Sequence, residues 1–143
     1  MNIYAVLLAP LLLSACVVPV ALPVPVPAGL EKPLSGSWQI TEAAGAGEIA
    51  PETVITFNDD KLQFGVATNC NRLFGGYEST VKNKTLKFSA VASTLKACPD
   101  METEQQLSRA LPQVRTYRLS GGNLEMLDEQ GRMVIRGKRA AGK

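Results

Sequence analysis

Alternation of apolar and polar residues is the feature that most constrains the fold of this chain. Trp38 and Ile40 alternate with polar neighbours, and Leu62, Phe64 and Val66 repeat the pattern further along. Successive side chains of a β-strand point to opposite faces, so a period of two predicts strands with one buried face. Similar short segments recur through the second half of the chain. The chain is therefore predicted to fold mainly as an antiparallel sheet.

Turn-forming residues separate the predicted strands and indicate hairpins. Asn and Asp side chains bond to their own backbone in turns, and Gly accepts positive φ. Such residues gather at 58–61, 82–84, 120–123 and 128–131. The strands that they separate are predicted around 38–40 and at 54–57, 62–66, 77–80, 85–89, 114–119, 124–127 and 133–136.

One segment has the signature of a helix. Asp100 can cap its first turn, and Glu102 and Glu104 suit the positive N-terminal end. Apolar residues spaced along 101–114 predict a buried stripe, and Pro112 limits the helix at its other end. An apolar stripe on a short helix is usually part of the core. The helix is therefore expected to cover the open face or mouth of the sheet.

The N-terminus predicts export and lipid attachment. Residues 3–13 are apolar but too few to span a bilayer, and the motif Leu-Ser-Ala-Cys follows at 13–16. This motif resembles the bacterial lipobox, in which cleavage leaves the cysteine, here Cys16, as the first and lipidated residue. Residues 1–15 would then be a signal peptide, with a plain signal peptide or a different start site as alternatives. In similar enterobacterial lipoproteins an aspartate after the cysteine often signals retention in the inner membrane. Val17 stands there instead, so the resemblance implies the outer membrane, with the domain facing the periplasm.

The segment 16–33 is expected to be a tether. Five of the nine prolines lie in it, alternating with valine, and proline favours an extended polyproline II conformation. At about 3.1 Å per residue it would reach roughly 50 Å. A globular domain at 34–137 follows, and the basic tail 138–143 carries no acidic residue. The tail is expected either to contact anionic lipid or to be a solvated terminus.

Composition argues against several classes of function. The chain has no histidine, the commonest general base and metal ligand, and its net charge of +2 gives no reason to expect a nucleic-acid partner. Ser93 and Lys96 match the S-x-x-K acylation motif, but its companion motifs are absent. Residues 58–60 lack the spacing of a calcium loop. No catalytic residue, metal or cofactor is therefore assigned.

If Cys16 carries a lipid, Cys70 and Cys98 are the two cysteines left to pair with each other. They form an even pair in an oxidising compartment, where a disulfide is expected. Closing the loop between them would contribute about 3–4 kcal/mol in the chain-entropy model. Two buried thiols and a redox pair are the alternatives, while two thiols without histidine make a poor metal site.

Two motifs that contain these cysteines resemble a known family. The sequences CNRLFGGY at 70–77 and STLKAC at 93–98 are similar to C-N-x-[FY]-x-G-x-Y and [ST]-T-x-M-x-C, the signatures of the META domain. The resemblance is to META domains of HslJ-like bacterial lipoproteins. It implies an α+β fold, with a strongly curved antiparallel sheet, half-barrel or cone-like, and one packed helix. It implies no enzymatic activity, and an association with heat-stress and envelope tolerance and with novobiocin resistance.

The first motif and its neighbours lead to specific expectations. Gly75 and Gly76 are expected at a bulge or tight bend of a strand, and Asn71 is expected to satisfy backbone groups at a corner. Lys96 stands where the family usually has methionine, so it is expected to extend to solvent unless the strand shifts. A candidate surface for a ligand or partner is formed by Arg72, Phe74, Tyr77 and Lys96.

These features together predict a function by binding. The expectation is a non-catalytic envelope lipoprotein that is anchored to the membrane through its lipid and supports stress or antibiotic tolerance. It would bind an envelope protein or other component that the sequence does not identify. The alternative is a periplasmic inhibitor or small-ligand-binding module that uses the mouth of the curved sheet, near the two aromatic residues of the first motif and the helix.

Overall fold

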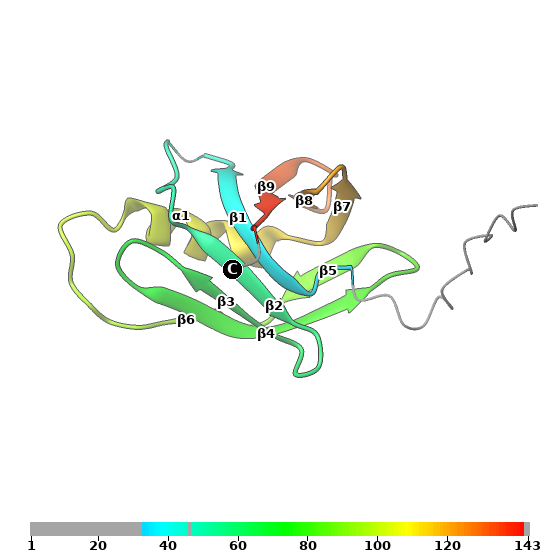
Figure 1. Cartoon of the computed structure of the whole chain (residues 1–143), viewed down its shortest axis with the longest axis horizontal. Helices are drawn as coiled ribbons and strands as arrows, with labels where there is room; N and C mark the ends of the chain where they lie inside the picture. Colours follow the sequence, from blue (N-terminus) through cyan, green and yellow to red (C-terminus); the bar gives the residue numbers. More distant parts are fainter. Residues whose placement is uncertain (1–32, 46, 142–143) are drawn as a thin grey trace, which may run out of the picture.

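The computed structural model describes residues 33–45 and 47–141 (Figure 1). The predicted signal peptide, the predicted lipidation site Cys16 and nearly all of the predicted tether lie outside the described residues. Within the described part, no helix is both long enough and apolar enough to cross a membrane.

The described chain contains nine strands and two short helices. The strands are β1 (Gly36–Ala43), β2 (Val54–Asn58), β3 (Gln63–Ala67), β4 (Arg72–Thr80), β5 (Thr85–Phe88), β6 (Ala92–Ser93), β7 (Thr116–Ser120), β8 (Asn123–Leu127) and β9 (Met133–Arg139). Between β6 and β7 lie the α-helix α1 (Glu102–Ala110) and the 3₁₀-helix η1 (Leu111–Gln113).

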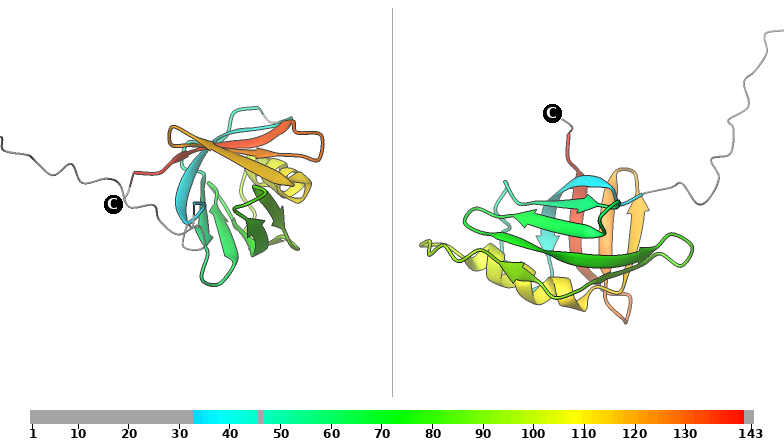
Figure 2. Two further views of the ribbon diagram at one scale, coloured as in Figure 1. Left: turned by 90° about the vertical axis from the view of Figure 1, so that its right-hand side faces the viewer. Right: turned by 90° about the horizontal axis from the view of Figure 1, so that it is seen from below.

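The strands form one antiparallel sheet that curls into a ring. Their order is β3-β2-β1-β9-β8-β7-β5-β4-β6, and β3 also pairs with β4, which closes the ring and leaves the short β6 beside β4. The pairing between β5 and β7 is short. Thr85 pairs with Thr116, the Leu86 amide donates to the Arg115 carbonyl, and the Tyr117 amide donates to the Lys84 carbonyl. The left view of Figure 2 looks along the ring, with α1 at its far end. The predicted strongly curved antiparallel sheet with one packed helix is confirmed.

The inward faces of the strands fill the ring with a single core. Trp38, Phe57 and Tyr117 are its largest fully buried side chains. From the helical segment, Leu107 and Leu111 join the same cluster and are fully buried. Complete burial of an aliphatic or aromatic side chain contributes about 1.5–3 kcal/mol, so the helix is held by its apolar face. The predicted apolar stripe of the helix is confirmed.

The helix ends follow local chemistry. The Asp100 carboxylate accepts a hydrogen bond of 3.1 Å from the Glu102 amide, so it caps the first turn, although the N-cap position itself is Met101. At the other end Pro112 lies within η1, where the chain tightens from α-helix to 3₁₀-helix. Proline lacks the amide that the next α-helical turn requires, which explains why α1 stops at Ala110.

The strand β4 begins earlier than the sequence predicted, and its two glycines have a different role. The segment was expected as a strand only from Tyr77, whereas β4 starts at Arg72 and pairs regularly with β3 through Gly75. The extra residue of a bulge lies instead along the other edge of β4, where β5 and β6 pair with it. The span from Phe74 to Tyr77 faces the span from Phe88 to Ala92, which is one residue longer. The extra residue brings the Ala90 carbonyl and the Ser89 hydroxyl close to the β4 backbone, so Gly75 and Gly76 have no room for a Cβ atom.

The end of the chain also differs from the prediction. β9 extends to Arg139, so the first two residues of the predicted basic tail 138–143 belong to the sheet. The Arg139 guanidinium lies 3.8 Å from the centre of the Trp38 ring and donates hydrogen bonds to the carbonyls of Ser35 and Pro33. This stacked arginine fastens the last strand to the start of the domain.

A ladder of alternating charges crosses the outside of four strands. Arg118 pairs with Glu125 at 3.3 Å, Glu125 with Arg136 at 3.1 Å, and Arg136 with Glu42 at 2.7 Å. In each pair the two residues are direct cross-strand partners in β7, β8, β9 and β1. Pairs of this kind contribute about 0.2–1 kcal/mol each, so the ladder supports the strand register more than it supports overall stability.

Substitution of Gly75 by alanine tests the close approach in β4. A Cβ atom at this position would lie 2.5 Å from the Ala90 carbonyl oxygen, which is backbone and cannot swing away. We expect Gly75→Ala to lower the free energy of unfolding by about 1–3 kcal/mol, the usual cost of overpacking. Gly47→Ala is the control, because its Cβ would meet only the end of the Glu102 side chain at 3.7 Å. Urea titration followed by Trp38 fluorescence measures both. Equal stability of the two variants would contradict this account.

Candidate functional site

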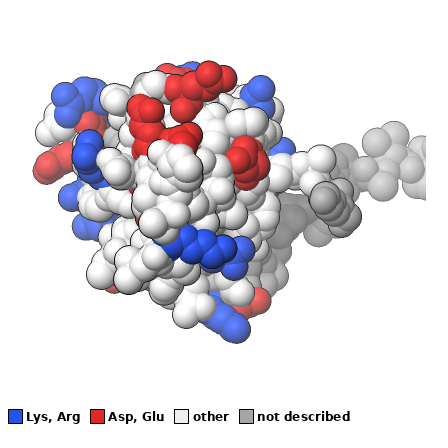
Figure 3. Space-filling view, turned by 90° about the vertical axis from the view of Figure 1, so that its left-hand side faces the viewer, with Lys and Arg blue, Asp and Glu red and all other residues white. Residues whose placement is uncertain are grey.

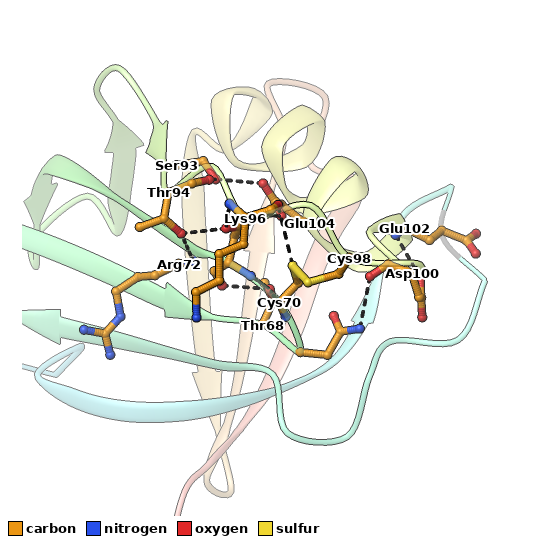
Figure 4. The surroundings of a disulfide bond; sticks show 12 residues. Thr68, Cys70, Arg72, Ser93, Thr94, Lys96, Cys98, Asp100, Glu102 and Glu104 are labelled. Carbon is orange, nitrogen blue, oxygen red and sulfur yellow. Dashed lines mark hydrogen bonds between the residues drawn. A yellow bond between two sulfur atoms is a disulfide. The ribbon is translucent and has the colours of Figure 1, made fainter.

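A disulfide joins the two segments that carry the sequence motifs. Cys70 lies in the turn between β3 and β4, and Cys98 lies in the segment that leads into α1. Their sulfur atoms are 2.01 Å apart and their Cα atoms 6.2 Å apart, with 28 residues of sequence separation. The expected disulfide is confirmed, and the alternatives of two free thiols or an open redox pair do not describe this structure. The link fastens the end of the ring to the start of the helix (Figure 4).

Asn71, next to the disulfide, is the centre of a buried hydrogen-bond network. Its amide nitrogen donates to the Glu104 carboxylate at 2.7 Å and to the Lys96 carbonyl at 3.0 Å. Its amide oxygen accepts from the Lys96 amide and from the Thr94 hydroxyl, both at 2.8 Å. These four bonds use the full capacity of an asparagine side chain. Asn71 thereby connects β4, the segment after β6 and the helix, which is more than the corner role predicted for it.

The serine of the S-x-x-K motif belongs to this network and does not face the lysine. Ser93 Oγ lies 2.7 Å from the Glu104 carboxylate. The Lys96 backbone is held by Asn71, while its side chain is exposed and extends away from Ser93 (Figure 4). The expectation that Lys96 extends to solvent is confirmed. The pair is thus not assembled as a nucleophile beside a base.

Three of the four residues predicted as a ligand or partner surface are exposed, and the fourth is buried. Arg72 and Phe74 point outward from β4, and the Lys96 side chain is also exposed. Tyr77 is only 3% exposed and lies in the core. Phe74 and Tyr77 are three positions apart on one strand, and side chains alternate between faces, so they point to opposite sides. Including Tyr77 in an exposed surface was wrong, and the two aromatics do not line a common mouth.

Tyr77 has a structural role inside the ring. Its ring packs edge-on against Phe57, with centroids 5.1 Å apart, and its hydroxyl donates a hydrogen bond to the Asp59 carboxylate. Burial raises the pKa of Tyr77 above its ordinary value of 10.0, and the hydrogen bond to the Asp59 carboxylate and the negative charge of that group raise it further. Tyr77 thus ties the turn between β2 and β3 to the core.

Two hollows on the outside of the ring lie near these motifs. One of about 430 Å³ is formed over β2, β3 and β4, where the small residues Gly65 and Ala67 lie between Thr56 and Arg72. The other, of about 410 Å³, is bordered by acidic residues at the helix N-terminus. Figure 3 shows acidic side chains gathered on this end of the molecule. The acids that border this second hollow are Glu48, Glu52, Asp100 and Glu102.

The chemistry of a metal centre is not assembled in the part of the chain that the structure describes. There, no group of three or more cysteine, aspartate or glutamate side chains converges as ligands would, and histidine is absent from the sequence. Sequence reasoning missed Glu104, which it assigned only to the helix N-terminus. Its burial at 7% exposure depends on Asn71 and Ser93, whose approach to the helix has no signal in the local sequence.

Replacing Asn71 tests whether this network holds the site together. We expect Asn71→Ala to lower the free energy of unfolding by about 2–4 kcal/mol, because several buried donors and acceptors would lose their partner at once. The control is Asn69→Ala, since Asn69 is exposed and makes one long bond, 3.3 Å, to the Asp100 carbonyl. Urea unfolding under oxidising conditions measures both variants. A loss no larger in Asn71→Ala than in Asn69→Ala would overturn the structural role of the network.

The raised pKa of Tyr77 predicts a specific dependence of stability on alkaline pH. The folded chain keeps the Tyr77 proton at pH values where the unfolded chain has lost it. The stabilisation from this group is therefore complete below about pH 10, the ordinary pKa, and declines as pH rises above it. Tyr77→Phe is expected to cost about 1–3 kcal/mol at neutral pH through the lost bond to Asp59. The difference in the free energy of unfolding between this variant and the wild type should narrow above about pH 10.

Unfolding titrations across this pH range measure the effect. Phe57→Leu is the control, because it disturbs the same aromatic contact without removing a titratable group. That control is expected to keep the alkaline decline. A difference in the free energy of unfolding between wild type and Tyr77→Phe that stays constant with pH would show that Tyr77 does not cause the alkaline decline.

Comparisons with known proteins agree with the fold described above. A DUF4847 family protein from Bacteroides vulgatus, known from a crystal structure, shares 17% sequence identity with this chain. The two structures match with a TM-score of 0.55 over 77% of this chain and 96% of that chain. An NMR structure of a protein from Burkholderia xenovorans is also 17% identical, with a TM-score of 0.59 over 86% and 94%. At this identity the likeness shows the fold alone. None of the curated proteins matches the chain.

A family model identifies the chain more closely. The model of the META domain matches residues 31–141, a span that includes both cysteine motifs, the helix and all nine described strands. This match covers well over half of the sequence, and it agrees with the resemblance of the two motifs at 70–77 and 93–98. The chain therefore belongs to the META domain family.

Proposed function

We propose that the protein is an envelope lipoprotein whose META domain supports tolerance to heat, envelope stress or antibiotics by binding another envelope component. In this proposal residues 1–15 are removed, Cys16 carries the lipid, and the domain faces the periplasm from the outer membrane. The membrane association would be through the lipid, and the domain would act without catalysis.

The disulfide is the observation that carries the proposal. Disulfides persist in exported proteins and are rare in the reducing cytosol. Because Cys70 and Cys98 are bonded to each other, Cys16 is the one cysteine of the three left for another chemistry. It stands at the end of the Leu-Ser-Ala-Cys motif, where acylation is expected. More than one acyl chain on that residue would make the anchor durable.

The placement of the motif residues favours binding over catalysis. Ser93 lies against the buried Glu104 carboxylate, whereas Lys96 extends to solvent. A nucleophile needs a base within hydrogen-bond reach, and this arrangement keeps the two apart. Arg72, Phe74 and Lys96, in contrast, offer exposed positive charge and apolar surface beside the disulfide.

A small-ligand-binding or inhibitory module is the second candidate. The hollow of about 430 Å³ over β2 to β4 favours it, because this volume is within the range of ligand pockets and Arg72 lies at its border. This hollow is on the outer face, so the ligand would not use the mouth of the sheet. Capture of a small molecule by the purified protein, lost on Ala67→Trp, would favour this candidate over a macromolecular partner.

The lipid anchor is tested by replacing Cys16. We expect the wild-type protein to be extracted from membranes with the mass of acyl chains on Cys16. The variant Cys16→Ala should lack that mass and move to the soluble periplasmic fraction, because the anchor is lost. The control is the double variant Cys70→Ala and Cys98→Ala, which keeps Cys16 and should stay in the membrane fraction. An unmodified Cys16 in the wild-type protein would defeat the anchor.

The binding role needs a separate experiment in the intact envelope. Crosslinking followed by mass spectrometry should recover a defined envelope component with the wild-type protein. A strain that lacks the protein should be sensitive to heat or novobiocin, and the wild-type chain should restore growth. Recovery of no component, or a hydrolase activity that disappears in Ser93→Ala, would overturn a role by binding alone.

A further inference from the structure

We propose that four exposed residues beside the disulfide, Arg72, Phe74, Leu95 and Lys96, dock the domain onto an anionic bilayer surface. We refer to them as the basic–apolar patch. The proposal deepens the proposed function, on which it rests, because a protein anchored at one end by lipid would then contact the membrane a second time through its folded domain.

The two apolar members of the patch are unusually exposed. Leu95 is 96% exposed and Phe74 is 44% exposed, and both are among the few large apolar side chains outside the core in the described part of the chain. Leu95 lies in the segment between β6 and the helix, so it projects from the surface and does not line an enclosed cavity. A projecting leucine and a part-exposed aromatic ring on adjoining segments are suited to the boundary between lipid headgroups and acyl chains.

The patch lies on two segments that run side by side. Phe74 of β4 pairs with Ala92 of β6, and the Thr94 amide donates to the Arg72 carbonyl just beyond. The same antiparallel course continues to Lys96, whose backbone is bonded to the Asn71 side chain. The side chains of Arg72 and Lys96 extend in the same direction, away from the disulfide and from Glu104 (Figure 4).

The two positive charges of the patch are available to an outside partner. Among residues 33–45 and 47–141, neither the Arg72 guanidinium nor the Lys96 ammonium forms an ion pair. Both side chains are exposed, while the network around Asn71 holds their backbones in place. Arginine and lysine near an anionic membrane are attracted to its surface potential, and exposed apolar neighbours add to that attraction.

The acidic side chains nearby are placed so that they would orient the domain. Asp100 and Glu102 lie on the other side of the disulfide from Arg72 and Lys96 (Figure 4). They belong to the acidic end of the molecule, together with Glu48 and Glu52. An anionic surface repels that end and attracts the basic–apolar patch. On the outer face of β4 the next acid is Glu78, whose register partner in β5 is Lys87.

The combination of charge and projection favours a bilayer over an acidic polypeptide. A polypeptide partner would need a groove or a long free strand edge, and β6 contains only two residues. The hollow beside Arg72 lies over β2 to β4, whereas Leu95 projects from the other side of β4, beyond β6. A fluid bilayer accepts a projecting side chain without a preformed counterpart.

Docking can be measured with the full chain reconstituted in vesicles through its own N-terminal anchor. The variant Leu95→Trp places an apolar reporter in the patch, while Trp38, 1% exposed, supplies a constant background seen in the wild type. We expect a blue shift of the added tryptophan on phosphatidylcholine vesicles that contain phosphatidylglycerol, and none on phosphatidylcholine alone. Added salt should weaken the shift, because it screens exposed charges.

Charge variants in the Leu95→Trp background identify the residues responsible. Arg72→Gln with Lys96→Gln should lower the equilibrium constant for docking on anionic vesicles by about 25-fold, since each surface charge is worth about fivefold. Lys82→Gln is the matched control, because it also removes an exposed lysine but lies in the turn after β4, outside the patch. The control should behave as the parent.

Three results would overturn the proposal. They are an unshifted emission on anionic vesicles, an equal shift on neutral vesicles, or an equal effect of Lys82→Gln. A shift produced by polyglutamate and not by vesicles would identify an acidic polypeptide instead. Failure of the proposed function is seen separately, as a Cys16 without acyl mass. Failure of docking leaves an acylated protein on the vesicles with the added tryptophan unshifted.

Discussion

The side chain of Asn71 makes the hydrogen bonds on which the architecture around the motifs depends. From its place just before β4 it reaches two other pieces of chain, the segment at Thr94 and Lys96 and the buried Glu104 carboxylate of the helix. A carboxylate is costly to bury without partners, and Asn71 and Ser93 supply them. The disulfide at Cys70 adds a covalent restraint one residue away, so the chain and the network enforce the same geometry.

The ring itself depends on an approach that only glycine permits. β4 is held between β3 and the edge formed by β5 and β6, and that edge carries one extra residue opposite Gly75 and Gly76. The extra residue brings a backbone oxygen and the Ser89 hydroxyl to within 2.5 Å and 2.8 Å of where Cβ atoms would be. Because β4 contributes both to ring closure with β3 and to the site beside the disulfide, the two glycines support fold and site together.

The sequence predicted the features that depend on local pattern and missed those that depend on register. Period-two alternation located the core strands, and the odd spacing of Phe74 and Tyr77 already implied opposite faces. Placing both on one surface ignored that rule because the glycines between them suggested a bend. Arg139 was assigned to a tail because its partners, Trp38 and the carbonyls of Ser35 and Pro33, lie about a hundred residues away. The charge ladder could not be predicted for the same reason, because the cross-strand partners of Glu125 and Arg136 can be identified only once the strand order is known.

Lys96, which departs from the family motif, lies where the structure buries no side chain. Leu95 and Lys96 follow directly after the residues that bond to Asn71 and Glu104, and both face solvent. The network binds Lys96 through its backbone amide and carbonyl, so the bonds that hold the site do not involve this side chain. A backbone fixed by hydrogen bonds that presents two exposed side chains is a suitable arrangement for a contact surface. The same bonds that make the motif structural thus hold its exposed residues at a defined place beside Arg72.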